Sequence, residues 1–562
     1  MQQTLKNFTQ QLIKSSLCRQ GLFLAAALVS ISLVGYHFGT FDQSVHLPFL
    51  KAWADPSLYP NDPFIALQKD QFSFFWFFFL PFLKLGVLEP VMFIAHLLAT
   101  TLFFMAIWEL GITLFGEPLA ALFAVVSFIF PHTGFVGFPV IEFSLLSRTF
   151  VLPFLLFAVN NFLRKRQEFA FLILGVMYNL NLLMTNFVLI IFIISSLIEI
   201  RRIGWRKLAL SLGLFIAGAL PVLIWKIRSG TGLDLSLRPE WFSAITRGAL
   251  YQIFYLFSKP PFMLLTLGGI SGIALFLIAR RIFLLNKHDI QLIHFMGALM
   301  GILVFQVVTT LWYPLTPIIQ MQFSRASLFI LVFAYVYFAG YLAKEYLSGK
   351  INGGNMILIF GCLILSLSPA IPLIAWLIYR KYPSLFNNRG LAVGAFLAIM
   401  TTIYSLGFMA INLWRPGIQI YARPSAWVDV QNWARENTTK DTLFITPPQE
   451  VGLYQPDWRV FSERGTIASL YDLFEIALKP DYYKTWKPRF ESLAPGALEE
   501  FHGNFFENQK ITKRAFNGLV REQILAIAAK YNASYLVTEK DNIQNLTMIY
   551  ENEKYKIYDL KK

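Results

Sequence analysis

Charged residues are scarce in this chain of 562 residues, of which they make up 14%, against roughly 25% in an ordinary soluble domain. Hydrophobic residues make up 56%. Apolar runs near the ~20 residues that cross a bilayer recur from Gly21 to Trp414. The scarcity of charge excludes a soluble globular protein and predicts a polytopic α-helical membrane protein.

Cysteines and common catalytic motifs are also lacking. The two cysteines, Cys18 and Cys362, have neither a metal-type nor a redox-type spacing. The sequence contains no GxSxG, no HExxH, no Walker loop and no dinucleotide fingerprint on a βαβ unit. Disulfide frameworks, metalloprotease chemistry and soluble nucleotide chemistry therefore have no support.

The formal net charge is +15, which in a soluble protein would suggest a nucleic-acid partner. Here lysine and arginine gather in short loops between apolar runs, as the positive-inside bias expects. We therefore predict membrane lipids and no nucleic acid as partners, with the basic N-terminal 20 residues in the cytoplasm and a first span that is retained. The basic loops predicted to share that side are 164–166, 201–207, 280–287 and 344–350.

The apolar runs predict about 12–13 spans in a multi-pass protein of the inner (plasma) membrane. Their approximate ranges are 21–38, 88–112, 117–131, 148–163, 169–184, 186–200, 206–226, 262–280, 291–311, 325–343 and 390–413. Residues 354–380 read as one long span or as two short ones parted around Ser366–Pro369. Residues 72–85 are aromatic but short, and we favour a re-entrant or interfacial helix because it leaves all the basic loops on one side.

From Arg415 the composition changes to that of a small α/β domain. A helix and a buried strand, 442–446, are followed by a second helix and strand within 521–540 and a closing hairpin within 546–560. We therefore predict a membrane domain, 1–414, and a C-terminal domain, 415–562. Thirteen spans would place the C-terminal domain outside the cytoplasm, and one span fewer would place it inside.

The first outer loop, 39–72, follows the first span and begins within a polar stretch. Charged groups beside a bilayer are costly and tend to mark function. We expect a short helix along the membrane surface, starting at Pro48 and ending at Asp55, because proline suits a first helical turn and the residue before Pro56 avoids the α region. The acidic and imidazole side chains of Gly35–Phe64 are His37, Asp42, His46, Asp55 and Asp62.

Asp42 and His46 are the leading catalytic candidates. Four residues apart, they share a face if the chain between them is helical, and an aspartate with a histidine can form a tuned base or two metal ligands. The alternative is that Asp42 caps the next helix. Asp55 and Asp62 lie in a proline-rich turn, where aspartate is common for local reasons, and are candidates for substrate binding. His37 is predicted to be a satisfied interfacial histidine.

Other predicted outer loops add candidates for substrate binding. His132, Glu142 and Arg148 lie in one of them. Glu142 and Arg148 form either an interfacial ion pair or a second acid with an anion contact. Arg325 begins a span on the side where arginine is disfavoured, and suits bidentate phosphate recognition. The remaining candidates, whose alternative is a lipid-headgroup contact, are Arg238, Arg247 and Lys259.

A first span, an acidic outer loop, a bundle of about a dozen spans and a small C-terminal α/β domain resemble the GT-C superfamily of glycosyltransferases. Its members include protein O-mannosyltransferases, aminoarabinose transferases and oligosaccharyl transferases. The architectural resemblance covers the whole chain. The stretches that resemble bacterial members most are GTFDQSVHLPFLKAWADPSLYPNDPF, from Gly39, and QNWARENTTKDTLFITPP, from Gln431.

This resemblance implies an enzyme that transfers a hexose or pentose from a polyprenyl-phosphate sugar donor to a cell-envelope acceptor on the outer face of the membrane. It assigns the catalytic acid to Asp42, with Glu142 as our choice for the second acid. Many relatives carry an acidic pair after the first span, whereas here Gln43 follows Asp42. The metal is therefore left open, with a divalent cation as the candidate cofactor.

Two other functions are open from the sequence. A transporter or flippase for a lipid-linked or polar solute would bind it with the same polar groups, although the sequence has no evident inverted repeat. A non-catalytic envelope scaffold would use the C-terminal domain for docking.

Overall fold

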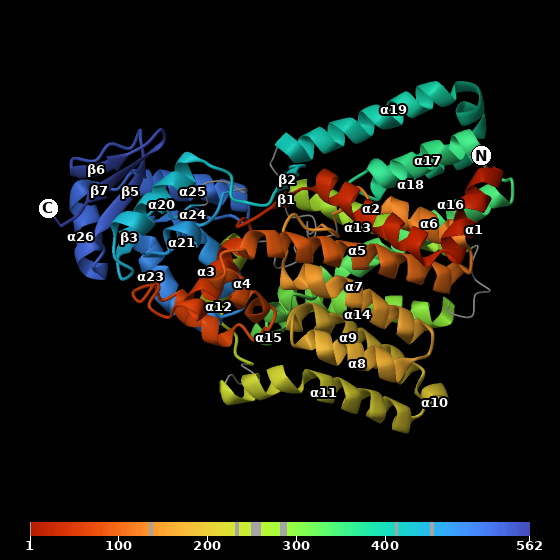
Figure 1. The fold of residues 1–562 in the computed structure, drawn as a ribbon, viewed down its shortest axis with the longest axis horizontal. Coiled ribbons are helices and arrows are strands. Elements are labelled where there is room, and N and C mark those ends of the chain that lie inside the picture. Colours follow the sequence, from red (N-terminus) through yellow and green to blue (C-terminus); the bar gives the residue numbers. More distant parts are fainter. Residues whose placement is uncertain are drawn as a thin grey trace.

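The structure, a computed structural model, describes residues 2–133, 139–230, 235–248, 260–281, 289–410, 414–449 and 455–561. These residues form a long bundle of helices with a small mixed sheet at one end (Figure 1). The N-terminus lies at the far end of the bundle, and the C-terminus lies in the part that holds the sheet. The chain is thus a polytopic α-helical membrane protein with a small C-terminal α/β part, here called the tail (residues 414–561).

The bundle is built from helices whose apolar runs set their lengths. Within the described residues their bounds are α1 Gln2–Lys14, α2 Ser16–Val34, α5 Leu88–Phe115, α6 Pro118–Ser127, α7 Ser147–Leu163, α8 Gln167–Tyr178, α9 Leu182–Ile198, α10 Ile200–Ile203, α11 Trp205–Arg228, α13 Pro260–Arg280, α14 Asp289–Trp312, α16 Leu328–Leu347, α17 Gly353–Leu365, α18 Ala370–Lys381 and α19 Pro383–Ala410. Each predicted span coincides with one of these helices. The ambiguous range 354–380 is two helices, which part at Ser366–Pro369.

Six of the helices in the described chain are long and apolar enough to cross a membrane. They are Ser16–Val34, Leu88–Phe115, Trp205–Arg228, Ile290–Trp312, Thr316–Leu347 and Arg389–Gly407. The most apolar 18-residue window of Thr316–Leu347 is fully buried inside the molecule, whereas that of Arg389–Gly407 is almost entirely uncovered by protein. The first therefore forms the centre of the bundle, and the second, in α19, runs along its edge (Figure 1).

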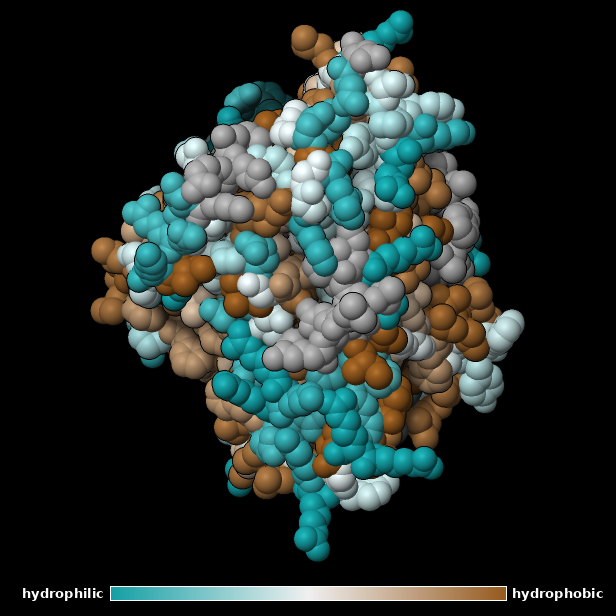
Figure 2. Space-filling view, turned by 90° about the vertical axis from the view of Figure 1, so that its right-hand side faces the viewer, coloured by the Kyte–Doolittle hydropathy of each residue, from teal (hydrophilic) through white to brown (hydrophobic). Residues whose placement is uncertain are grey.

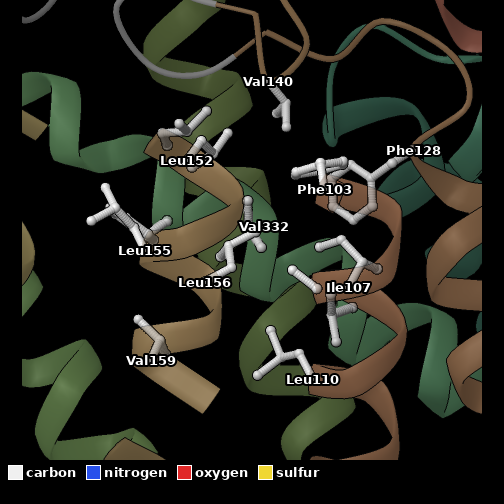
Figure 3. Packing of buried hydrophobic residues seen from close by; sticks show 14 of the residues in the cluster. Phe103, Ile107, Leu110, Phe128, Val140, Leu152, Leu155, Leu156, Val159 and Val332 are labelled. Carbon is white, nitrogen blue, oxygen red and sulfur yellow. The ribbon is translucent and has the colours of Figure 1, made fainter. Parts of the chain in front are cut away.

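Apolar side chains at helical spacing form the core of the bundle (Figure 3). Phe103, Ile107 and Leu110 of α5 recur along one face of that helix, and belong to the same cluster as Leu155 and Val159 of α7. All five are less than 4% exposed. The packed core therefore gives the loops at the ends of the helices a rigid support.

The end of the bundle away from the tail carries basic loops. Figure 2 views the molecule from this end and shows hydrophilic side chains gathered over its centre and lower part, with hydrophobic side chains along the flanks. Lys207 donates to the backbone carbonyl of Lys165 at 3.3 Å and pairs with Glu168, so the loops before α8 and α11 lie together. Glu199 pairs with Arg202 and with His294 of α14. The basic loops 164–166 and 201–207 thus share one end, as predicted.

The first loop, residues 39–72, differs from the expectation in one respect. Its helix α3 runs over Gln43–Ala54, with Pro48 inside the helix and Asp55 at its C-cap. The prediction that Pro48 starts the helix is wrong, because packing of α3 into two apolar clusters outweighs the proline's local preference. The next elements are short: η1 Ile65–Asp70, η2 Trp76–Phe79 and α4 Leu80–Lys84. Residues 72–85 therefore form short helices, as the non-spanning interpretation expects.

The tail contains both predicted helix–strand units and the hairpin. Its sheet has the order β4-β3-β5-β7-β6, with parallel pairing between β3 and its neighbours and antiparallel pairing in the rest. Its strands are β3 Leu443–Ile445, β4 Gly465–Thr466, β5 Tyr535–Glu539, β6 Thr547–Glu551 and β7 Tyr555–Asp559. Its helices are α20 Ala426–Asn437, α21 Trp458–Ser462, η5 Leu470–Asp472, α22 Leu473–Ile476, η6 Pro480–Tyr482, α23 Tyr483–Leu493, α24 Ala497–Glu500, α25 Phe505–Asn517 and α26 Arg521–Tyr531.

The tail and the loops at its end of the bundle share a hydrophobic core. One cluster combines Phe49 and Phe64 of the first loop and Trp241 of α12 (Pro239–Gly248) with Leu473 and Trp486 of the tail. A short parallel pair, β1 (Tyr36–His37) with β2 (Ile418–Gln419), joins the end of α2 to the start of the tail. The first loop is therefore enclosed between the bundle and the tail.

Candidate active site at the first loop

Three charged side chains meet at the start of α7. The guanidinium of Arg148 donates from Nη1 to Oδ2 of Asp42 at 2.5 Å. Its Nε and Nη2 donate to the two carboxylate oxygens of Glu142 at 2.5 and 3.1 Å. One arginine therefore holds two carboxylates, one from the first loop and one from the loop before α7, in a fixed geometry.

The side chain of Gln43 explains how Asp42 is positioned. The backbone N–H of Gly39 donates to Oε1 of Gln43 at 2.8 Å, and Nε2 of Gln43 donates to the carbonyl of Leu145 at 2.8 Å. Gln43 is fully buried, so it ties the turn before α3 to the loop before α7. Gln43 thus has a structural role here. It occupies the position after Asp42 at which many relatives are expected to carry a second acid.

Asp42 occupies the N-cap position of α3 but makes no side-chain cap hydrogen bond. Its carboxylate is turned to Arg148 instead, and its side chain is 29% exposed. Burial alone would raise the pKa of Asp42, but the charge and hydrogen bond of Arg148, with the charge of Arg325, hold that pKa below its usual value. Asp42 is therefore ionised at neutral pH and remains accessible from outside.

His46 lies one turn after Asp42 in α3. Its imidazole packs on the ring of Trp76, with 5.0 Å between ring centroids. Burial lowers the pKa of His46, while the negative charges of Glu475 and Asp42 act in the opposite direction. The net shift is downward, so the imidazole is neutral at pH 7 and can accept a proton.

Arg325 lies in the short helix η4 (Phe323–Ser327), between α15 (Thr316–Met321) and α16. Its charge acts on Asp42, so the structure brings Arg325 to the same region as Asp42 and Arg148. Five sequence candidates, Asp42, His46, Glu142, Arg148 and Arg325, thus come together at this end of the bundle.

A divalent cation would have to compete with Arg148 for the carboxylates at this site. Within the described part of the chain, no group of three or more His, Cys, Asp or Glu side chains is arranged to hold a metal ion. The carboxylates of Asp42 and Glu142 both accept hydrogen bonds from Arg148.

The two other aspartates of the first loop contact the tail. Asp55 accepts hydrogen bonds from Ser57 and pairs with Lys440 at 2.5 Å, and these hydrogen bonds lower the pKa of Asp55 to about 2. Asp62 is buried and pairs with Arg459 at 2.6 Å. Both therefore attach the first loop to the tail in the structure.

The remaining candidates lie apart from the Arg148 group. Both ring nitrogens of His132 are within hydrogen-bond distance of backbone carbonyls, those of Ser127 and Ser366. Arg238 pairs with Asp481 of the tail at 2.7 Å. Lys259 lies outside the described residues. His37 is satisfied as predicted, by Gln419 and the carbonyl of Arg415.

Glu475 is a charged residue near this site that the sequence did not indicate. It is buried in the four-residue helix α22 of the tail and accepts a hydrogen bond from Gln71 at 3.0 Å. Helix α22 has only four residues, too few to show a periodicity, and nothing in its sequence marks Glu475 as a neighbour of the first loop. Only the packing of the tail against the first loop brings it there.

Three comparisons with known proteins give limited matches. Residues 425–493 match a family model described as a domain of unknown function (DUF6798). No curated protein matches the chain. Among solved structures, the chain is similar to the oligosaccharyltransferase AglB from Archaeoglobus fulgidus in complex with an inhibitory peptide and a dolichol-phosphate, at 12% identity and a TM-score of 0.45, over 92% of this chain and 69% of that one.

It is also similar to ArnT from Cupriavidus metallidurans bound to undecaprenyl phosphate, at 13% identity and a TM-score of 0.43, over 96% of this chain and 97% of that one. At this identity and these TM-scores the similarity identifies no substrate. The functional argument therefore depends on the site itself.

Proposed function

We propose that the chain is an integral-membrane glycosyltransferase that transfers a sugar from a polyprenyl-phosphate-linked donor to a cell-envelope acceptor. In this proposal the first loop and the tail face the outer side of the membrane. The sequence resemblance to the GT-C superfamily supplies the substrate class. The two solved structures bound to dolichol-phosphate and undecaprenyl phosphate contain ligands of that class.

The observation that carries the proposal is the ionised, partly exposed carboxylate of Asp42, which pairs with Arg148 and is also under the charge of Arg325. Transfer from a phosphate-linked sugar needs a group that accepts the acceptor's proton and a cation that stabilises the departing phosphate. Both lie at one end of a bundle whose exposed helices face lipid, where a lipid-linked donor would present its head group.

The reaction assigns one event to each group. As the acceptor oxygen bonds to the anomeric carbon, its proton passes to the Asp42 carboxylate. The bond between that carbon and the phosphate oxygen breaks, and the phosphate leaves with the bonding electrons. Because glycosyl transfer passes through an oxocarbenium-like state, the acceptor proton becomes acidic late, and a carboxylate of low pKa can then receive it.

Arg148 and Arg325 have different roles in this scheme. The Nε, Nη1 and Nη2 atoms of Arg148 all donate to the carboxylates, so Arg148 orients Asp42. Arg325 is then the phosphate contact, since a guanidinium binds phosphate through two parallel hydrogen bonds. Glu142 fixes the plane of the Arg148 guanidinium from the other side.

The test is transfer by the full chain reconstituted in vesicles that contain radiolabelled undecaprenyl-phosphate sugars, with an envelope extract as acceptor. Loss of a general base typically costs about 10²–10⁴-fold in rate, so we expect D42N to lose at least about 100-fold. The matched control is D541N, which neutralises an exposed aspartate of the tail and should leave the rate unchanged.

Turnover by D42N close to that of the wild type would reject Asp42 as the base. Movement of labelled sugar lipid across the bilayer with no new covalent product would reject the transferase and favour the flippase. If the wild type neither transfers sugar nor moves the label, and D42N behaves in the same way, the non-catalytic scaffold is the function that remains.

A further inference from the structure

A small cavity lies between the start of α3 and the tail. Its volume is about 20 Å³, and a cavity of at least about 10–15 Å³ can hold one water-sized group. Ser44 lines it from the first loop, and the other lining residues belong to the tail. Two of these, Gln455 and Asp457, are partly exposed, so a ligand can approach the cavity from their side.

One wall of the cavity is fixed to the turn that carries Asp42. The Oγ atom of Ser44 donates to the carbonyl of Gly39 at 2.8 Å and accepts a hydrogen bond from the backbone N–H of Asp457 at 3.1 Å. In the sequence Asp42 lies between Gly39 and Ser44. A group that occupies the cavity therefore contacts the same turn that holds the proposed base.

Two lining residues have a buried polar atom that has no hydrogen-bond partner within the described chain. The atoms are Nε1 of Trp458, a donor, and Oε1 of Gln449, an acceptor. The neighbouring Trp427 differs, because its Nε1 donates to the carbonyl of Pro456 at 2.8 Å. A buried polar group without a partner is costly, so an occupant that bonds to both atoms is favoured.

The two atoms together select a hydroxyl group. A hydroxyl donates one hydrogen bond and accepts up to two, so it can bond to Oε1 of Gln449 and to Nε1 of Trp458. An ammonium group cannot accept from Trp458, and an ionised carboxylate cannot donate to Gln449. Asp457 adds a carboxyl group to the same wall, which further disfavours an anion.

Aromatic rings surround this polar position. The ring centroids of Trp427 and Trp458 lie 5.7 Å apart, with 52° between the ring planes, and Tyr471 also lines the cavity. Such side chains combine a flat apolar surface with a polar group. A sugar ring carries hydroxyls beside apolar C–H faces, so it matches both features, whereas a serine or threonine hydroxyl of a peptide has no ring face beside it.

We propose that this cavity binds one hydroxyl of a saccharide, and that this saccharide is the acceptor of the transfer reaction. The role as acceptor rests on the proposed function, whereas the binding of a saccharide does not. Trp458 and Gln449 are then binding residues for the acceptor, which uses one hydroxyl for binding and another for the attack on the donor sugar.

The binding is tested by retention of saccharides on the full-length protein in immobilised lipid nanodiscs. The probe is the saccharide fraction of the envelope extract, carrying a fluorescent label. We expect the wild type to retain it. W458F keeps an aromatic ring but removes the donor, and should bind about three- to tenfold more weakly, the factor that one neutral hydrogen bond contributes.

Q449L removes the acceptor at similar size and should weaken binding by a similar factor, which keeps the test decisive if W458F does not fold. The matched control is W433F, because Trp433 stacks on Tyr550 elsewhere in the tail and does not line the cavity. No retention by the wild type, or equal retention by the wild type and the variants that fold, would mean that the cavity holds water only and would overturn the proposal. Retention of the peptide fraction instead, lost in the same variants, would overturn the saccharide.

The acceptor role has a separate readout in the vesicle transfer assay. Trp458 is assigned to binding and not to the reacting atoms, so W458F should raise KM for the acceptor about three- to tenfold with kcat little changed. An unchanged KM in a variant that retains less saccharide would overturn the acceptor role. If the wild type transfers no sugar but retains saccharide in a manner that depends on Trp458, the proposed function fails while the binding site stands.

Discussion

Arg148 determines the geometry of both acids at the residue scale. It contacts Asp42, which lies 106 residues earlier in the chain, and grips Glu142 through two parallel hydrogen bonds. A lysine carries the same charge but cannot make a planar fork. The orientation of Asp42 therefore depends on the guanidinium as well as on its charge.

Replacing Arg148 changes the pH at which Asp42 is ionised. Because Arg148 holds the pKa of Asp42 below its usual value, R148Q should raise that pKa. Transfer requires ionised Asp42, so the rate should fall at a higher pH on the acid side than in the wild type. The measurement is the pH–rate profile of reconstituted R148Q between about pH 4 and pH 7, the range in which a shifted aspartate titrates.

R164Q is the matched control for this prediction. Arg164 also pairs with a glutamate, Glu109 at 3.2 Å, but lies beyond the end of α7 on the basic side of the bundle. Its loss should leave the acid side of the profile in place. The same acid limb in R148Q and in the wild type would mean that Arg148 does not set the ionisation of Asp42.

The sequence identified residue types better than partners. Asp42, Glu142 and Arg148 stood out because charge beside a membrane span is costly, and this reasoning was sufficient to select them. It selected Asp62 for the same reason, although Asp62 pairs with Arg459 in the tail. A buried ion pair and a reactive site use the same types of side chain. Only contacts between residues that lie hundreds of positions apart in the sequence distinguish the two.

At the scale of elements, long helices were predictable and short ones were not. A span such as α5 or α11 needs an apolar run of about 20 residues with polar ends, which one sequence displays directly. Helices of four or five residues, such as α21 and α22, contain too little pattern and form because the surrounding tail packs around them. For α3 the helix itself was predicted but its start was not, since Pro48 lies inside it.

The close packing of α8 against α11 depends on small residues at the contact. A Cβ at Gly175 of α8 would lie 2.3 Å from the backbone oxygen of Phe215 in α11. That backbone cannot yield without separating the two helices. We expect G175A to lower stability by about 1–3 kcal/mol, measured as a lower apparent melting temperature of the purified protein in detergent.

G213A provides the control on α11 itself. Beyond the adjoining backbone of α11, no atom of the described chain lies within 4 Å of the position that a Cβ would take at Gly213, and alanine favours a helix over glycine. Its melting temperature should equal or exceed that of the wild type. Equal melting temperatures for G175A and the wild type would show that the helices separate at little cost.

At the scale of the whole molecule, the tail is joined to the bundle by a buried ionic group. Arg459 of α21 pairs with Asp62 of the first loop at 2.6 Å and with Asp472 of the tail at 2.9 Å. All three side chains are at most 2% exposed. Burial raises the pKa of Asp472 to about 7, with nearby Asp62 and Asp457 contributing and Arg459 opposing the shift. The Arg459 guanidinium thus pairs with both buried carboxylates, those of Asp62 and Asp472.

Removing Arg459 should loosen the tail, and more so at high pH. Breaking a buried ion pair by deleting one partner typically costs about 3–5 kcal/mol, because the other charge is left uncompensated. Asp472 has a folded pKa above its unfolded value, so its contribution to stability is fully present at acid pH and is lost as the pH rises towards about 7. Without Arg459 the buried carboxylates can avoid the penalty only by remaining protonated. R459A should therefore be destabilised more at pH 8 than at pH 5.5, as measured by urea unfolding in detergent followed by the tryptophan fluorescence of the tail.

R521A, which removes an exposed arginine at the start of α26, should have the stability of the wild type at both pH values. Equal destabilisation of R459A at the two pH values would mean that lost packing, and not the carboxylates that Arg459 neutralises, accounts for its effect on the attachment of the tail.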